Sequence, residues 1–175
     1  MYVAFLRGIN VSGKNKIVMS DLVKSFENQG FLSVKHYLNT GNIVFNVENA
    51  SSTIKSMEQS ITEMIRNEFD LNIHVIVLSK KDLVQITEAY PFESEDGKNM
   101  YVTLMQNPPI PELSSSIESV KKPVDSFLIT GNVLYLYVPS GYGKSKLSNN
   151  FIEKKGQVTA TTRNINTFKK LQNML

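Results

Sequence analysis

The spacing of apolar residues in the first half of the chain predicts alternating strands and helices. Apolar residues at helical spacing predict helices over residues 19–29, where Gly30 is a stop signal, and over 52–69. Short apolar runs predict strands at residues 2–7, 34–38, 43–47 and 73–78. Asn39-Thr40-Gly41-Asn42 predicts a tight hairpin between the second and third strands, because Gly and Asn tolerate positive φ.

The second half of the chain predicts the same succession of elements. Ser79 and Asp82 form a capping box that starts a linking helix, which ends before Pro91, and the polar stretch 93–99 follows. The second half predicts strands at 100–106, 124–129, 132–138 and 158–161, and helices at 111–121, from about 144 to 155, and up to Leu175. The order βαββαβ is that of ferredoxin-like folds, in which two helices cover one face of an antiparallel sheet.

Two sequence matches in the same order indicate that the chain repeats itself. MYVAFL at residues 1–6 returns as MYVTLM at 100–105, and TGNIVF at 40–45 returns as TGNVLY at 130–135. The predicted fold is therefore α+β, a tandem duplication of a ferredoxin-like sandwich with antiparallel sheets covered by helices. The predicted boundaries are a first unit at 1–79, a linking helix and loop at 80–98, and a second unit with a C-terminal helix at 99–175. On this basis, Gly41 and Gly131 are expected in equivalent hairpin turns.

Composition excludes several classes of protein. The 175 residues include no cysteine and two histidines, which removes disulfides, thiolate zinc sites and a cysteine nucleophile. We expect no metal and no cofactor, and we expect His36 and His74 to be structural. No apolar stretch is long enough for a membrane span and the N-terminus does not resemble a signal peptide, so a cytoplasmic location is expected.

Charge is distributed unevenly along the chain. Residues 1–79 are balanced, and residues 80–140 carry a net charge of −3. Residues 141–175 carry seven Lys and Arg against one Glu, a net charge of +6. A basic segment of this kind is either a solvated helix face or a surface that binds anions.

Two basic, glycine-containing segments are candidate anion sites. The first follows the first strand and supplies Arg7, Asn10, Lys14 and Lys16 in a loop with two glycines. The second follows a predicted strand and opens a predicted helix, an arrangement in which free N–H groups bind phosphate. Its candidates are Tyr142, Gly143, Lys144, Ser145 and Lys146. It is not a P-loop, because Val138 stands where that motif requires glycine.

A third polar segment lies near the C-terminus, at residues 161–167. Its candidates are Thr162, Arg163 and Asn164. Arg163 can pair with a phosphate or with an internal carboxylate, and Asn164 can cap the final helix. If the three segments form one site, Arg7, Lys144 and Arg163 should line a common cleft.

Four separated motifs resemble a known family over almost the whole chain. They are YVAFLRGINVSGKNKI, YLNTGNIVF, GNVLYLYVPSGYGKSKL and TATTRNINTFKKL. In this order they resemble the bacterial family called domain of unknown function 1697. The resemblance implies a duplicated ferredoxin-like architecture, and it implies no established activity, cofactor or catalytic residue.

The residues leave more than one function open. We expect the protein to bind an anionic ligand, such as a nucleotide, a phosphorylated metabolite or nucleic acid, through the basic loops. The alternatives are a small enzyme acting on a phosphorylated substrate and a structural or dimerisation module. The basic segments hold almost no carboxylate that could act as a general base, which favours binding. The oligomeric state is not determined by these patterns.

Overall fold

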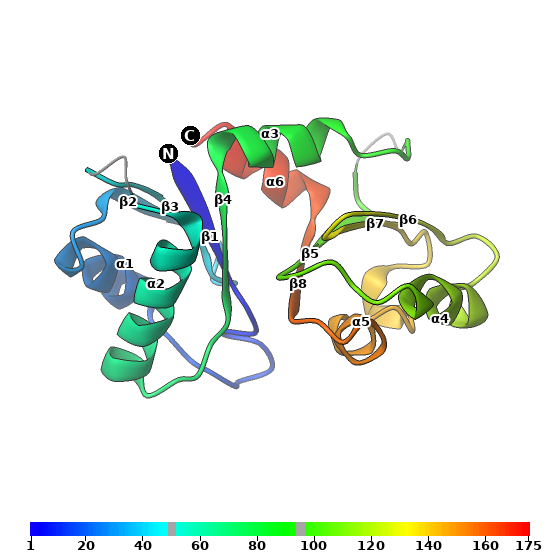
Figure 1. Cartoon of the computed structure of the whole chain (residues 1–175), viewed down its shortest axis with the longest axis horizontal. Helices are drawn as coiled ribbons and strands as arrows, with labels where there is room; N and C mark the ends of the chain where they lie inside the picture. The colour runs from blue at the N-terminus through cyan, green and yellow to red at the C-terminus, as the bar shows by residue number, and fades with distance from the viewer. Residues whose placement is uncertain (49–51, 94–96) are drawn as a thin grey trace. The chain divides into compact units, whose positions relative to one another are not determined.

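The chain divides into two compact units in its computed structural model, which describes residues 1–48, 52–93 and 97–175 (Figure 1). The first unit is Met1–Val84 with Leu171–Leu175, and the second is Gln85–Lys170. The polar stretch predicted at 93–99 falls in part on residues 94–96, which lie outside the described residues. None of the helices in the described ranges is long and apolar enough to cross a membrane.

The first unit is a four-stranded antiparallel sheet with two helices against one face (Figure 1). Its elements are β1 (Tyr2–Leu6), α1 (Met19–Asn28), β2 (Leu32–Tyr37), β3 (Asn42–Asn46), α2 (Ile54–Phe69) and β4 (Val75–Ser79). The strands lie in the order β2-β3-β1-β4, so β1 is central and is paired with both β3 and β4. Helix α3 (Lys80–Glu88) follows β4, and the predicted capping box is confirmed because Ser79 Oγ accepts the N–H of Asp82 at 3.2 Å.

The second unit repeats this order of elements. They are β5 (Met100–Met105), α4 (Glu112–Val120), β6 (Ser126–Thr130), β7 (Val133–Tyr137), the 3₁₀ turn η1 (Tyr142–Lys144), α5 (Asn149–Gly156), β8 (Ala160–Asn164) and α6 (Ile165–Gln172). The sheet order β6-β7-β5-β8 corresponds strand for strand to that of the first unit. Two open antiparallel sheets with helices form the α+β, duplicated ferredoxin-like arrangement that the repeat predicts.

The core of each unit lies between its sheet and its helices. In the first unit, the inward residues of β1 and β3 include Ala4, Leu6 and Phe45, which pack with Phe26 of α1 and Ile61 of α2. All five are fully buried. Burying such side chains stabilises the fold by about 1.5–3 kcal/mol for each large one. Each helix is therefore oriented with its apolar face against the sheet.

One helix begins later than its sequence pattern predicts. The helix expected from about Lys144 is α5, and it begins only at Asn149, where Ser148 Oγ accepts the N–H of Phe151 at 3.3 Å. Residues 142–144 form a separate 3₁₀ turn instead. The sequence pattern missed this because the polar residues after Gly143 are compatible with either a 3₁₀ turn or the first turn of a helix. The cap formed by Ser148 fixes the start of α5 at Asn149.

The expected equivalence of Gly41 and Gly131 is wrong. In the first unit Tyr37 pairs with Asn42 and Gly41 is the last of four loop residues, whereas Thr130 pairs with Val133 and Gly131 is the first of two. The N–H of Leu6 donates to Gly41 O, and the corresponding N–H of Met105 donates to Asn132 O. The two Thr-Gly-Asn triplets are thus shifted by one residue, and the likeness of the units rests on their shared strand order.

Carboxylates from the helices cover one edge of each sheet. Strands β4 and β8 are edge strands. The outward N–H of Val77 on β4 donates to Glu58 Oε1 of α2 at 2.9 Å, and that of Ala160 on β8 donates to Glu153 Oε1 of α5 at 2.9 Å. Each bond satisfies a donor that an edge strand otherwise leaves open to another chain. Burial raises the pKa of Glu58, and its bond to Val77 offsets part of that effect.

Gly41→Ala should destabilise the first unit strongly. Gly41 has a φ of 78°, and an added Cβ would lie 2.7 Å from Leu6 Cβ. Gly131, with a φ of 57° and open space around it, is the matched control. Gly131→Ala should cost about 1–2 kcal/mol for the left-handed backbone alone, and Gly41→Ala about 1–3 kcal/mol more for the overlap. Amide hydrogen exchange, which reports on each unit separately, measures both, and equal costs would contradict the close packing.

Glu58→Gln should be at least as stable as the parent protein at pH 7, whereas Glu58→Ala should be less stable. Glutamine keeps an acceptor for the N–H of Val77 and carries no charge, and alanine leaves that N–H unpaired. Because the pKa of Glu58 is raised on folding, its ionised form costs stability above that pKa, and the cost fades as the pH falls. The parent should therefore gain stability relative to Glu58→Gln in urea unfolding as the pH falls from 7 through the raised pKa toward the ordinary value of 4.5. A constant difference across that range would contradict the assignment.

Candidate functional site

The loop after β1 is held in one shape by the side chain of Asn10. Asn10 Oδ1 accepts the N–H of Ile17 at 2.9 Å, and Nδ2 donates to Ile17 O at 3.0 Å. Nδ2 also donates to Asn39 O at 2.9 Å, which ties the loop to the β2–β3 hairpin. Asn10 was predicted as a ligand residue, and its amide is occupied with positioning the loop.

The same loop contains three non-glycine residues in the left-handed region. They are Asn10, Ser12 and Asn15, with φ values of 54°, 49° and 48°. Asn15 Nδ2 donates to Gly8 O at 3.0 Å, and the N–H of Asn10 donates to Asn15 O at 3.1 Å, so the turn closes on itself. Left-handed backbone costs on the order of 1 kcal/mol or more per residue and persists only where surrounding bonds impose it. Such conformations gather at functional sites.

An open cleft of about 720 Å³ lies between this loop, the start of α1 and the β2–β3 hairpin. Its polar lining comes from Asn10, Gly13, Lys16, Ser20, His36 and Asn39. Ile17, Val18 and Met19 complete it, and Val18 is 63% exposed. The cleft therefore combines a polar rim with an exposed apolar patch, a combination common in sites for small ligands.

The charged residue among the described residues that line the cleft is Lys16. Lys16 and His36 are both exposed, and the described residues that line the cleft include no Asp or Glu. Ser20 adds a hydroxyl in the first turn of α1, where the helix dipole is positive. An anion in this cleft would meet Lys16 and hydrogen-bond donors, and Asp21, in the same turn as Ser20, is not among the described lining residues.

The corresponding groove of the second unit has a different chemistry. It lies between residues 108–111, α4 and β6, and it measures about 470 Å³. Pro108, Pro109 and Ile110 line one side, and Phe127 and Leu128 line the other. The described residues that line this groove include no charged side chain, so the charge of the first cleft is not a requirement of the fold.

Two predicted site residues of the second unit meet in a saturated hydrogen-bond network. Tyr142 Oη donates to Thr162 Oγ1 at 3.2 Å, and Thr162 Oγ1 donates to Asn149 Oδ1 at 3.1 Å. Thr103 Oγ1 lies 2.8 Å from Thr162 Oγ1. Thr103 is the donor of this bond, because the hydroxyl proton of Thr162 already goes to Asn149. Burial raises the pKa of Tyr142, which keeps its phenol protonated as a donor. These side chains stabilise one another.

The third predicted segment is a strand, and the strand separates its residues. Thr162 pairs with Thr103 and Arg163 with Val102 on β5, so their side chains lie on opposite faces of the sheet. Arg163 Nη1 donates to Thr161 Oγ1 at 2.7 Å and to Thr162 O at 3.0 Å. Burial lowers the pKa of Arg163 to about 10, although part of the residue remains exposed, and it stays charged at neutral pH.

Asn164 holds the start of α6, as its sequence position predicts. Its Oδ1 accepts the N–H of Asn166 at 2.8 Å. Its Nδ2 donates to the carbonyl oxygens of Gly97 and Lys98 at 3.0 and 3.1 Å. Its amide is therefore used within the second unit.

The glycine-lysine turn does not present a helix N-terminus. Lys144 N–H donates to Gly141 O, Ser145 N–H donates to Tyr142 O, and Ser145 Oγ accepts the N–H of Leu147. Gly143, Lys144 and Lys146 are exposed, as is Lys14 in the first unit. These lysines stay candidates for surface contacts, but the helix-start geometry that motivated Gly143 is absent.

Arg7 belongs to the first unit, and Lys144 and Arg163 belong to the second. Arg7 is half-buried, and its N–H donates to His74 O at 2.9 Å. A common cleft lined by all three stays a prediction. The described residues contain no group of three or more His, Cys, Asp or Glu that could hold a metal ion.

The sequence patterns missed three polar side chains of the first cleft, namely those of Ser20, His36 and Asn39. His36 was expected to be structural, yet it is exposed. A usable signal existed in the predicted topology. In a βαββαβ unit, the loop after the first strand and the hairpin after the second strand reach the same end of the sheet, so their polar residues become neighbours.

Comparison with known proteins adds the family. Residues 1–135 match the model of the family described as protein of unknown function (DUF1697). The chain belongs to this family. No curated protein matches it. Among solved structures, it is similar to the conserved bacterial protein SP0830 from Streptococcus pneumoniae, with a TM-score of 0.75 and 23% identity over 99% of this chain and 97% of that one. At this identity the likeness supports the fold alone.

Thr162→Val should destabilise this DUF1697 protein by about 1–3 kcal/mol, because Tyr142 loses its acceptor and Asn149 loses its donor. Thr162→Ser is the matched control, since it keeps the hydroxyl and loses one methyl group, which costs about 0.8 kcal/mol. Urea unfolding of the three proteins gives the comparison. Equal losses in both variants would mean that the hydroxyl network adds nothing to stability.

Proposed function

We propose that this protein binds a phosphate-bearing ligand in the cleft of its first unit. The observation that carries the proposal is a cleft of about 720 Å³ with Lys16 and His36 in its lining and no carboxylate among its described lining residues. Lys16 supplies a flexible cation with three donors. Ser20 and the start of α1 supply further donors beside it.

The rigid loop supports binding rather than a solvated surface role. Asn10 joins the loop to residues on both sides of the cleft, Ile17 and Asn39, so the cleft walls are held in place before a ligand arrives. A preorganised site loses less entropy on binding than a flexible one. The apolar group of Ile17, Val18 and Met19 offers a surface for a non-polar part of the ligand. A nucleotide or a phosphorylated metabolite has both parts.

The alternatives have weaker support. A small enzyme acting on a phosphorylated substrate needs a general base, and His36 is the lining residue that could fill this role. A dimerisation module based on exposed apolar sheet faces is not favoured, because Val3, Phe5 and Val44 on the second face of the first sheet are buried. A cytoplasmic location, as expected from the sequence, is part of the proposal.

Lys16→Ala should weaken binding of ADP by about 1.5–3 kcal/mol, the contribution of one charge-assisted hydrogen bond. Lys14→Ala is the matched control, because Lys14 belongs to the same loop, is also exposed and is not among the residues that line the cleft. Isothermal titration of the parent and both variants with ADP and with inorganic phosphate measures the difference. A second control, Lys144→Ala, tests the glycine-lysine turn of the second unit.

A salt titration separates the ligand classes. Binding of a single-stranded RNA that neutralises many phosphates should weaken steeply with salt, whereas a phosphorylated small molecule in the cleft should respond less. Absence of binding by phosphate, ADP and RNA would overturn the proposal. Equal losses for Lys14→Ala and Lys16→Ala would show that binding depends on general surface charge and not on this cleft.

A further inference from the structure

Each sheet has two edge strands, and three of the four edges carry a feature that opposes pairing with another strand. Glu58 and Glu153 occupy outward N–H groups of β4 and β8. Strand β2 has an irregular register between Leu32 and Lys35, with Ser33 at a φ of 52°, and it exposes Lys35 and His36. Bulges, charges and capped donors are the usual protections of a sheet edge.

The fourth edge, β6, has none of these features. Its sequence, Ser-Phe-Leu-Ile-Thr, contains no charge and no proline, and all five residues pair with β7 in continuous register. Leu128 at its centre is 43% exposed, and Val124 just before the strand is 58% exposed. An uncharged, regular and exposed edge is a template for another strand.

The hairpin geometry identifies which backbone groups of β6 face outward. Thr130 and Val133 flank a two-residue loop, so this pair exchanges hydrogen bonds. Because bonded and non-bonded pairs alternate in an antiparallel ladder, Leu128 also bonds to β7. The N–H and C=O groups of Phe127 and Ile129 therefore point away from the sheet.

These outward groups are complementary to a second copy of themselves. In an antiparallel pair centred on Leu128, Phe127 of each copy faces Ile129 of the other, and the two residues exchange both backbone hydrogen bonds. Leu128 faces Leu128 in a close, non-bonded pair, and Ser126 faces Thr130. Aromatic with β-branched, apolar with apolar and Ser with Thr are all favourable cross-strand pairs.

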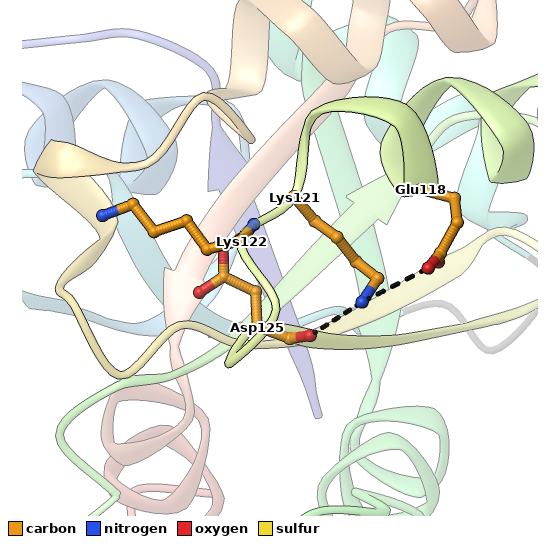
Figure 2. A network of polar contacts seen from close by, with 4 residues as sticks. All are labelled: Glu118, Lys121, Lys122 and Asp125. Atoms are coloured by element: carbon orange, nitrogen blue, oxygen red, sulfur yellow. Dashed lines mark hydrogen bonds and ion pairs between the residues drawn. The ribbon is translucent and has the colours of Figure 1, made fainter.

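The charges that flank β6 are complementary in the same arrangement. Lys122 lies before the start of β6, and Figure 2 shows its side chain extending away from Glu118, Lys121 and Asp125. Lys121 is instead held by Glu118 at 3.3 Å. At the other end of β6, Gly131 and Pro111 line one groove. Glu112 directly follows Pro111 and is exposed in the first turn of α4. Antiparallel pairing brings the Lys122 end of each copy beside the Glu112 end of the other.

We propose that β6 is a self-association edge, at which a second copy of this chain adds its own β6 in antiparallel register centred on Leu128. The occupant is a second copy because both the strand sequence and the flanking charges are complementary under a twofold axis. A five-residue edge buries less than the roughly 800 Å² per partner of a stable interface. The dimer is therefore weak and forms at high protein concentration.

Sedimentation equilibrium of the full chain from about 10 µM to about 1 mM tests the proposal over the range expected of a small interface. The parent should pass from monomer to dimer, and Leu128→Lys should weaken the dimer at least about tenfold by placing two lysines opposite each other. Leu32→Lys is the matched control. Leu32 lies on edge strand β2 and is also 43% exposed, so its substitution should leave the dimer unchanged.

A charge exchange tests the register. Glu112→Lys and Lys122→Glu should each weaken the dimer, and the double variant should restore it, because the two charges still face each other with their signs exchanged. Urea unfolding of each variant checks that the fold is retained. A monomer at all concentrations, a dimer equally sensitive to Leu32→Lys and Leu128→Lys, or no recovery in the double variant would overturn the proposal.

Discussion

The central strand of each sheet is the constraint on which the rest of this protein depends. Residues 3–6 of β1 are completely buried, and β5 is buried along nearly its whole length. A strand buried on both faces must satisfy every backbone group through neighbouring strands, because no water reaches it. Strands β3 and β4 therefore pair along both sides of β1, and β7 and β8 do the same for β5.

The pairing at the end of β1 also creates the candidate site. The N–H of Leu6 donates to Gly41 O of the hairpin, and the N–H of Arg7 donates to His74 O before β4. The chain leaves the sheet between these two anchors, and Asn10 then binds Asn39 O of the same hairpin. Gly41 fits against Leu6 and Ile9 with no room for a side chain. The position of the cleft thus follows from the β2–β3 hairpin and the long loop after β1, which meet at this end of the sheet.

The two units show how one fold can carry different chemistry. The first has a long loop with Lys16 beside an exposed His36, whereas the second has prolines beside Phe127 and Leu128. The edge strands differ in the same way, since β2 is irregular and charged and β6 is regular and apolar. Backbone pairing sets the architecture in both units, and the side chains at the rim are free to differ because they contribute little to the core.

The sequence by itself determined the α+β class, the order of the elements and most of their positions, because hydrophobic spacing reflects which face of each element is buried. It also indicated the basic loop with Asn10 and Lys16, since two glycines and several donors follow a strand. Only the tertiary structure decided which polar residues meet. Thr162 and Arg163 are adjacent in sequence but lie on opposite faces of β8, whereas Lys16 and His36 are twenty residues apart and line one cleft. Spacing along a chain reports on local periodicity, and a site is formed by strand pairing between distant segments, which local periodicity does not encode.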